Sequence, residues 1–162
     1  MQTKKVKTLN ELKKIVARLK KQGKKIVFTN GCFDIIHVGH VRYLKQAKGC
    51  GDILVIAVNS DSSVRKLKGK NRPLVALKDR LEVLSALEFV DYVVVFSEET
   101  PARVIETLRP NILVKGSDYR LNKIVGRDFV ESTGGKVVTI PLIKGKSTTA
   151  LINKIVSTCK KL

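Results

Sequence analysis

Apolar residues recur along the chain with two different periods. Between residues 8 and 22 they are three or four apart, as on one face of an amphipathic helix, at Leu9, Leu12, Ile15, Val16 and Leu19. Thr8 and Glu11 have the spacing of a capping box at the start of this segment. Gly23 follows it, and glycine is common just after the C-terminus of a helix. We therefore predict a helix over residues 8–22.

Predicted strands and helices then alternate to the end of the chain. Short apolar runs predict strands at residues 25–29, 53–59, 92–96, 112–114 and 136–141. Periodic segments and capping residues predict helices at residues 37–48, 60–67, 77–89, 101–108, 127–133 and 147–159. Pro101 takes the first helical position of its segment in this prediction. The alternation indicates an α/β fold with a doubly wound parallel sheet of about five strands. We expect a single domain over residues 1–162, with the N-terminal helix of residues 1–23 packed on it.

Most of the polar and glycine-rich sequence lies in the loops that follow the predicted strands. These loops are residues 30–40, 59–73, 97–100, 115–120 and 142–149. In a parallel α/β sheet, ligands bind at the carboxyl ends of the strands. We therefore expect these loops to face one common cleft.

Composition narrows the cellular setting and the kinds of site. The N-terminus has no apolar leader segment, and no apolar run approaches the ~20 residues of a membrane span. Three cysteines without paired spacing argue against a disulfide framework and against a zinc site. We expect a cytoplasmic protein without a membrane partner and without a metal site built from its own side chains. Cys32 is expected to be a small buried residue rather than a nucleophile.

The chain is strongly basic, with a formal net charge of +18. Such a charge could attract nucleic acid. However, aromatic residues make up only 5% of the chain and there is no Trp, so few side chains are available to stack on bases. We expect a solvated lysine-rich surface that attracts small anions, and we keep a basic nucleic-acid-binding domain as an alternative.

The only two histidines, His37 and His40, lie on either side of Gly39 at the start of a predicted helix. Residues three apart share a helix face, and a helix N-terminus offers unpaired N–H groups and a positive dipole end. Two imidazoles there could donate hydrogen bonds to phosphate oxygens whose charge develops in a transition state. We expect Gly39 to let a ligand approach without a Cβ in the way. The pair predicts a phosphate-binding site.

The motif His37-Val38-Gly39-His40 resembles the H-x-G-H signature of the nucleotidyltransferase superfamily. A second signature of that superfamily, with hydroxyl residues opening the last helix, is matched by Ser147, Thr148 and Thr149. The match extends to one family, the bacterial D-glycero-β-D-manno-heptose 1-phosphate adenylyltransferases. It rests on an ordered set of segments spread over residues 8–157, namely 29–34, 59–64, 67–69, 72–73, 90–93, 100–101, 114–116, 118–119 and 134–135.

This resemblance implies a single-domain Rossmann-like nucleotidyltransferase fold and assigns roles to particular residues. The implied catalytic residues are His37, His40 and Lys68. The implied nucleotide-binding residues are Asn30, Gly31, Phe33, Gly39, Arg72, Ser147, Thr148 and Thr149. The implied substrate-binding residues are Asp34, Asp61 and Asp118, where Asp34 either faces the acceptor or positions a neighbouring cation. Arg80 either serves the site or pairs with Asp79 or Glu82.

The implied reaction transfers AMP from ATP to a sugar 1-phosphate, with Mg²⁺ bound mainly through the triphosphate. The resemblance also implies a homodimer and, since no kinase sequence is present, a separate heptose kinase. Two departures from the pattern bear on the acceptor. First, Ala150 stands where the superfamily often has Lys or Arg, and Lys144 or Lys146 would then supply the positive charge. Second, Ser117 stands where the heptose family often has glycine. An adenylyl- or cytidylyltransferase for another acceptor, such as glycerol 3-phosphate, stays open.

Overall fold

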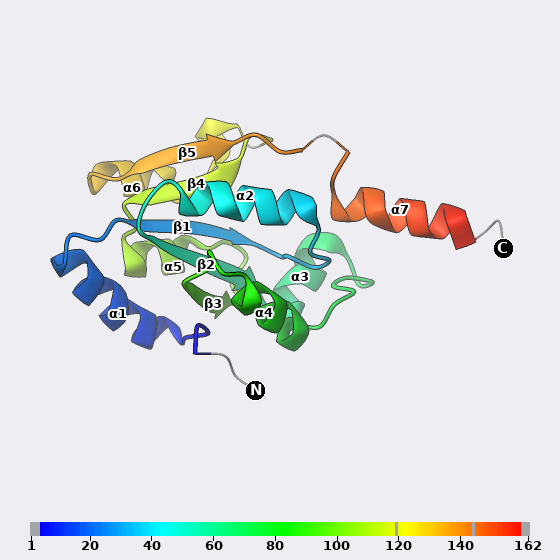
Figure 1. The fold of residues 1–162 in the computed structure, drawn as a ribbon, viewed down its shortest axis with the longest axis horizontal. Coiled ribbons are helices and arrows are strands. Elements are labelled where there is room, and N and C mark those ends of the chain that lie inside the picture. Colours follow the sequence, from blue (N-terminus) through cyan, green and yellow to red (C-terminus); the bar gives the residue numbers. More distant parts are fainter. Residues whose placement is uncertain (1–3, 119, 144, 160–162) are drawn as a thin grey trace.

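The computed structural model describes residues 4–118, 120–143 and 145–159, and the side chain of residue 121 is outside the description. Its elements follow one another as an alternating series (Figure 1). They are α1 (Leu9–Lys21), β1 (Ile26–Gly31), α2 (Val38–Lys48), β2 (Ile53–Asn59), α3 (Asp61–Lys68), α4 (Leu77–Ala86), β3 (Tyr92–Phe96), α5 (Ala102–Leu108), β4 (Ile112–Gly116), the 3₁₀ turn η1 (Leu121–Lys123), α6 (Arg127–Ser132), β5 (Lys136–Ile140) and α7 (Thr148–Cys159).

The five strands form one parallel sheet in the order β3-β2-β1-β4-β5. This confirms the predicted α/β fold with a doubly wound sheet. The chain first moves outward from β1 through β2 to β3, and then returns to place β4 on the other side of β1. The order therefore reverses between β1 and β4, which is where such sheets open a crevice for ligands.

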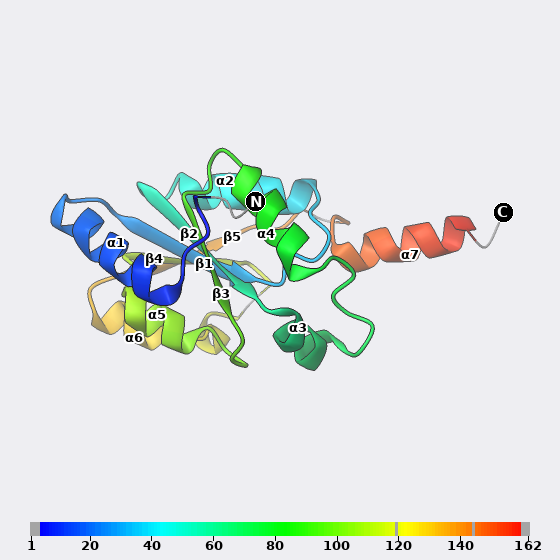
Figure 2. The same ribbon diagram turned by 90° about the horizontal axis from the view of Figure 1, so that it is seen from below.

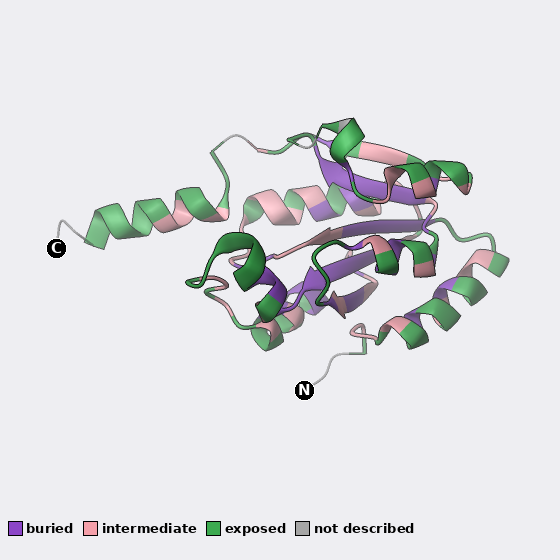
Figure 3. Cartoon of the chain, turned by 180° about the vertical axis from the view of Figure 1, so that it is seen from behind, coloured by how far each residue is buried: buried purple, intermediate pink, exposed green. Residues whose placement is uncertain are grey.

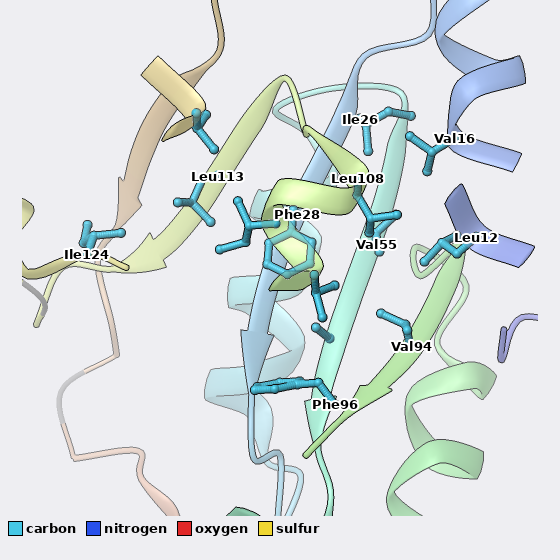
Figure 4. Close-up of a cluster of buried hydrophobic side chains, with 14 residues drawn as sticks. Leu12, Val16, Ile26, Phe28, Val55, Val94, Phe96, Leu108, Leu113 and Ile124 are labelled. Atoms are coloured by element: carbon cyan, nitrogen blue, oxygen red, sulfur yellow. The ribbon is translucent and has the colours of Figure 1, made fainter. Parts of the chain in front are cut away.

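Helices cover both faces of the sheet (Figure 2). On one face α2 and α4 pack on a cluster that includes Leu44, Leu84 and Val114. On the other face α1, α5 and α6 pack on a second cluster, whose members surround Phe28 (Figure 4). The strands are buried from both sides, which explains why they read as continuous apolar runs in the sequence.

The helix α1 begins with the predicted capping box. The Glu11 N–H donates to the Thr8 hydroxyl oxygen at 3.3 Å, and the Thr8 N–H donates to the Glu11 carboxylate at 2.8 Å. Leu12 and Val16 bury the apolar face of α1 in the cluster around Phe28. The N-terminal helix is therefore packed on the sheet.

The residues just before α1 pair with the edge strand β3. Val6 forms a parallel bridge with Val93. The Lys7 N–H donates to the Val93 carbonyl at 2.9 Å, and the Val93 N–H donates to the Lys5 carbonyl at 3.0 Å. This short pairing covers part of the outer edge of the sheet at β3.

Several element boundaries differ from the predictions, and one short turn was not predicted. The helix α4 ends at Ala86 because Leu87 takes an extended conformation, and the chain then enters the core at Val90. Pro101 is the N-cap of α5 rather than its first helical residue. Strand β4 continues to Gly116, two residues beyond the predicted end, through pairing with β5. The short turn η1 was not predicted, because three residues carry too little periodicity.

The helix α7 extends away from the body of the molecule (Figure 1). None of its described residues is buried (Figure 3). Ile155 and Val156 remain 51% and 47% exposed. Only its N-terminal turn approaches the sheet. Among the helices of the described residues, none is long and apolar enough to cross a membrane.

Candidate active site

A cavity of about 590 Å³ opens at the carboxyl ends of the strands. All five loops predicted to face a common cleft contribute to its lining. With the exception of Asp61, every residue assigned to the site from the sequence lines this cavity. They are Asn30, Gly31, Phe33, Asp34, His37, Gly39, His40, Lys68, Arg72, Asp118, Ser147, Thr148 and Thr149.

The two histidines lie at the start of α2, with their ring centroids 4.0 Å apart. His37 is the N-cap, and its Nδ1 accepts a hydrogen bond from the Gly39 N–H at 3.1 Å. An Nδ1 that accepts places the proton of the neutral ring on Nε2. A Cβ on Gly39 would lie 2.8 Å from His37 Cε1 and 3.2 Å from the Lys146 carbonyl oxygen. The glycine therefore leaves room for the capping imidazole itself, whereas the approach of a ligand at this position stays a prediction.

The surroundings of both imidazoles favour their neutral form. Burial, with a smaller contribution from the neighbouring His37, lowers the pKa of His40 to about 4. Burial also lowers the pKa of His37, with a smaller effect from Lys146. The His40 Nδ1 is buried and has no hydrogen-bond partner within the described part of the chain. At neutral pH the pair therefore offers N–H donors to phosphate rather than full positive charges.

Phe33 shapes the turn between β1 and the histidines. Its backbone lies in the left-handed region, with φ of 47°, and its ring centroid lies 5.4 Å from that of His40. A Cβ on Gly31 would lie 3.1 Å from the Phe33 ring, so a small residue is needed there. The turn thus brings the Phe33 ring next to the His40 ring.

The N-terminus of α7 forms the second wall of the cavity. The Ser147 hydroxyl oxygen caps the helix by accepting from the Ala150 N–H at 3.1 Å. The Thr148 hydroxyl donates to the Ile35 carbonyl at 3.4 Å, which connects α7 to the loop before α2. Two helix N-termini therefore meet at one cavity, and each favours an anion. Lys146 lines the same wall, whereas Lys144 lies outside the described residues.

Asp34 fastens the basic loop (residues 68–73) to the cavity. Asp34 is only 3% exposed. Its carboxylate accepts three hydrogen bonds, from the Leu74 N–H at 2.8 Å, the Val75 N–H at 2.8 Å and the Arg72 Nε at 2.6 Å. Burial raises the pKa of Asp34, but these hydrogen bonds and the charge of Arg72 outweigh it and hold the pKa below the ordinary value. The carboxylate positions a cation, which is one of the two roles foreseen from the sequence. Lys68 lines the cavity from the same loop and is exposed.

Asp61 is committed to a buried arginine. The Arg80 guanidinium is 1% exposed, and its Nη2 donates to Asp61 at 2.7 Å and to the Asn59 carbonyl at 2.9 Å. It also contacts the Cys32 carbonyl and donates from Nε to the Val75 carbonyl at 3.1 Å. Arg80 therefore pairs with Asp61, and the prediction of a pair with Asp79 or Glu82 is wrong. Asp61 is absent from the cavity lining because its carboxylate faces α4.

The floor of the cavity contains a lysine to which the sequence analysis gave no role. Lys115 lies near the end of β4, is 7% exposed and contacts the Asn30 side-chain oxygen through its Nζ. The nearby Asp118 raises its pKa, but burial is the larger effect and lowers the pKa to about 8. The available signal was a single charged residue directly after an apolar strand, at the end of the strand where ligands bind.

Two other residues bear on earlier expectations. Cys32 is half-buried and lines the cavity, and burial raises the pKa of its thiol, as suits a residue that is not a nucleophile.

Ser117 is exposed, and its N–H continues the sheet by donating to the Ile140 carbonyl at 2.9 Å. Its side chain is not part of the cavity lining.

No group of three or more His, Cys, Asp or Glu side chains able to hold a metal ion occurs among the described residues. The carboxylate with the deepest burial, Asp34, is already occupied by three donors. The cavity therefore combines donors and cations suited to a polyphosphate with few groups suited to a metal.

The strand order, the crevice at the reversal point and two helix N-termini bearing imidazoles and hydroxyls define a nucleotide-binding α/β protein. Over residues 28–153 the chain matches the cytidylyltransferase-like family, and it belongs to that family. It is a nucleotidyltransferase.

Curated relatives and solved structures extend this result. Bifunctional protein HldE of Geobacter sulfurreducens is 56% identical over 151 residues, and the match covers 93% of this chain and 31% of that protein. Bifunctional protein HldE of Citrifermentans bemidjiense is 54% identical over 153 residues, with coverage of 94% and 31%. The chain thus spans about a third of the length of these relatives.

Among solved structures, a lipopolysaccharide core biosynthesis protein from Thermoplasma volcanium superimposes with a TM-score of 0.62 and 31% identity, covering 75% of this chain and 98% of that one. A pantoate-beta-alanine ligase from Francisella tularensis superimposes with a TM-score of 0.61 at 18% identity, covering 94% of this chain and 77% of that one. This second likeness concerns the fold alone.

Proposed function

We propose that the protein transfers AMP from ATP to D-glycero-β-D-manno-heptose 1-phosphate, releasing pyrophosphate and forming ADP-heptose. The observation that carries this proposal is the cavity at the strand reversal, which gathers the paired histidines, the N-terminus of α7 and the basic loop around one space. The relatives named HldE, at 56% and 54% identity, support the choice of heptose phosphate as the acceptor.

In the proposed reaction an oxygen of the acceptor phosphate attacks the α-phosphorus of ATP. A new P–O bond forms in line with the bond to the β-phosphate, which breaks and releases pyrophosphate with its electron pair. The acceptor phosphate is anionic at neutral pH, so the protein needs neither a nucleophile nor a strong base. Catalysis then depends on alignment and on stabilisation of charge.

The described residues suit these two tasks. The neutral rings of His37 and His40 would donate to oxygens of the triphosphate while negative charge builds up on them. Ser147, Thr148 and the backbone N–H groups of α7 would hold the outer phosphates. The Arg72 guanidinium, held by Asp34 at 2.6 Å, and the exposed Lys68 would add positive charge from the facing loop.

We propose Mg²⁺ as the cofactor, held through the triphosphate and water. This assignment fits a cavity that is rich in phosphate-binding groups and has no carboxylate cluster within the described residues. Bound in this way, Mg²⁺ would neutralise charge on the leaving pyrophosphate. The remaining proposals are a homodimeric state and supply of heptose 1-phosphate by a separate kinase.

The test is release of pyrophosphate from a panel of nucleotides and acceptors. ATP, CTP, GTP and UTP are each combined with heptose 1-phosphate, glucose 1-phosphate and glycerol 3-phosphate, with and without Mg²⁺. We expect the highest kcat/KM for ATP with heptose 1-phosphate, and no release when EDTA replaces Mg²⁺. Faster turnover of CTP or of glycerol 3-phosphate would show that the proposed nucleotide or acceptor is wrong, while the reaction would still be a nucleotidyl transfer.

A further inference from the structure

We propose that Lys115 binds the phosphate of the acceptor and holds it opposite the α-phosphate of the nucleotide, as a catalytic residue of the transfer. The inference rests on the proposed function, since it concerns the second substrate of that reaction. It begins with position. Lys115 projects from β4 beside β1, at the reversal of the strand order, and lines the cavity there.

The side chain of Lys115 points to the face of the sheet opposite the histidines. Successive side chains of a strand alternate between faces, so Lys115 shares the face of Leu113, which packs in the cluster around Phe28. Its Nζ contact with Asn30, two residues after Phe28 on β1, agrees with this placement. The intervening Val114 packs in the cluster beneath α2. The imidazoles and Lys115 therefore reach the cavity from opposite sides of the strand ends.

This separation assigns the two sides to different phosphates. The starts of α2 and α7 provide enough donors for the triphosphate, and they lie together through the contact of Thr148 with the Ile35 carbonyl. The attacking phosphate must approach the α-phosphorus from the side away from the leaving pyrophosphate. A cation on the far side of the strand ends is placed to hold that group.

The surroundings of Lys115 suit an anionic ligand. Its neighbours include the neutral Asn30 amide on β1 and the uncharged Thr139, its pairing partner on β5. Titratable groups in this part of the cavity include the Asp118 carboxylate in the following loop and the Tyr43 phenol of α2, whose hydroxyl donates to the Val114 carbonyl at 3.1 Å. A buried ammonium is unfavourable unless a compensating charge is close. Asp118 already supplies one such charge, and a dianionic acceptor phosphate in the cavity would add a second.

Asp118 completes the arrangement by its position over Gly116. A Cβ on Gly116 would lie 2.4 Å from the Asp118 Oδ1, so the carboxylate folds back over the glycine towards Lys115. In our proposal the ammonium takes the acceptor phosphate, and the carboxylate takes a hydroxyl of the sugar. The two groups would distinguish a sugar phosphate from inorganic phosphate.

The first test uses the full chain with Lys115→Gln, Lys115→Arg and a control, Lys45→Gln, at an exposed position on α2. Pyrophosphate release is measured while ATP and the acceptor phosphate are varied separately. We expect Lys115→Gln to raise the KM of the acceptor about tenfold or more, because a charge-assisted contact is lost, and to change the KM of ATP less than about twofold. Lys45→Gln should match the wild type in both. A raised KM for ATP with an unchanged KM for the acceptor would overturn the assignment.

The second test is the pH profile of kcat/KM for the acceptor between pH 7 and 9.5. Since the pKa of Lys115 is about 8, the wild type should lose efficiency as the ammonium deprotonates above that pH. Burial raises the pKa of the Cys32 thiol above its ordinary value, so the thiol deprotonates at higher pH than Lys115. Lys115→Arg should lack the decline, because guanidinium stays protonated, while an unchanged decline would contradict the proposal.

The acceptor used in both tests is whichever compound of the panel the wild type turns over fastest. If the enzyme turns over glycerol 3-phosphate but not heptose 1-phosphate, the proposed substrate is wrong. The KM comparison with glycerol 3-phosphate then still decides whether Lys115 binds the acceptor phosphate. Thermal unfolding of each variant, followed by circular dichroism, separates lost binding from lost fold. A normal unfolding temperature with a normal acceptor KM in Lys115→Gln would refute the role.

Discussion

Replacement of Asp34 by alanine should destabilise the protein strongly, although Asp34 lies in the cavity. In Asp34→Ala the Leu74 and Val75 N–H groups each lose a partner at 2.8 Å, and the Arg72 guanidinium loses its counter-charge at 2.6 Å. An unpaired buried donor costs about 1–3 kcal/mol, and breaking a buried ion pair costs roughly 3–5 kcal/mol. Because these effects overlap, we expect a total loss of about 3–5 kcal/mol. For a chain of this size the loss corresponds to a Tm about 10 °C lower.

Asp34→Asn divides the loss into two parts. The amide oxygen can still accept from the Leu74 and Val75 N–H groups, whereas the amide NH₂ would face the Arg72 donor. We therefore expect roughly half the loss of stability seen in Asp34→Ala. The loss of activity should be similar in both variants, because each releases Arg72 from its position. Circular dichroism melting gives the first comparison, and pyrophosphate release gives the second.

The pH dependence supplies an independent check. The folded state lowers the pKa of Asp34, so its contribution to stability is fully present above the unfolded value of about 3.9 and is lost as pH falls through the folded value. The difference in Tm between wild type and Asp34→Asn should therefore shrink below about pH 4. Glu106→Gln, at an exposed position on α5, serves as the control. A Tm of Asp34→Ala within about 2 °C of the wild type at pH 7 would refute the reasoning.

Three further predictions concern the site. His40→Ala should lower kcat by about 10²-fold or more with the fold intact, because a donor to the transition state is lost; a near-normal kcat in the pyrophosphate assay would exclude this role. Gly39→Ala should lower kcat at least about tenfold without a change in Tm, because the new Cβ would lie 2.8 Å from His37 Cε1 and displace the imidazole. Full activity in this variant would show that the position of the His37 ring is unimportant. Asp61→Asn should lower the Tm by several degrees through its contact with buried Arg80, and leave the acceptor KM within about twofold. A normal Tm with a raised KM would instead restore Asp61 as a substrate ligand.

The sequence predicted the elements of the fold well because they depend on local patterns. The capping box of Thr8 and Glu11 and the apolar runs of β1 and β2 are short-range signals, and the structure contains them at nearly the predicted positions. The meeting of the five loops followed from the general geometry of parallel sheets. The end of α4 could not be read locally, because tertiary packing draws Val90 into the core.

Side-chain pairing was harder to predict than side-chain location. Asp61 and Arg80 are 19 residues apart, and nothing in the local sequence shows that the carboxylate turns towards α4 rather than into the cavity. The N-cap role of His37 was also hidden, because the motif places the histidine but not the direction of its ring. Lys115 was hidden by the number of lysines, since burial alone separates it from the solvated ones.

The pairing of residues 5–7 with β3 has a consequence for the behaviour of the protein at high concentration. The exposed edge of a sheet is a template for association with another chain, and here the backbone of Lys5 and Lys7 occupies the hydrogen-bonding groups of Val93. A chain that begins at Thr8 would keep every helix, every strand and the whole cavity. It would nevertheless leave the Val93 N–H and carbonyl open at the sheet edge. We expect such a chain to retain its activity in dilute solution and to self-associate with rising concentration, as light scattering would detect.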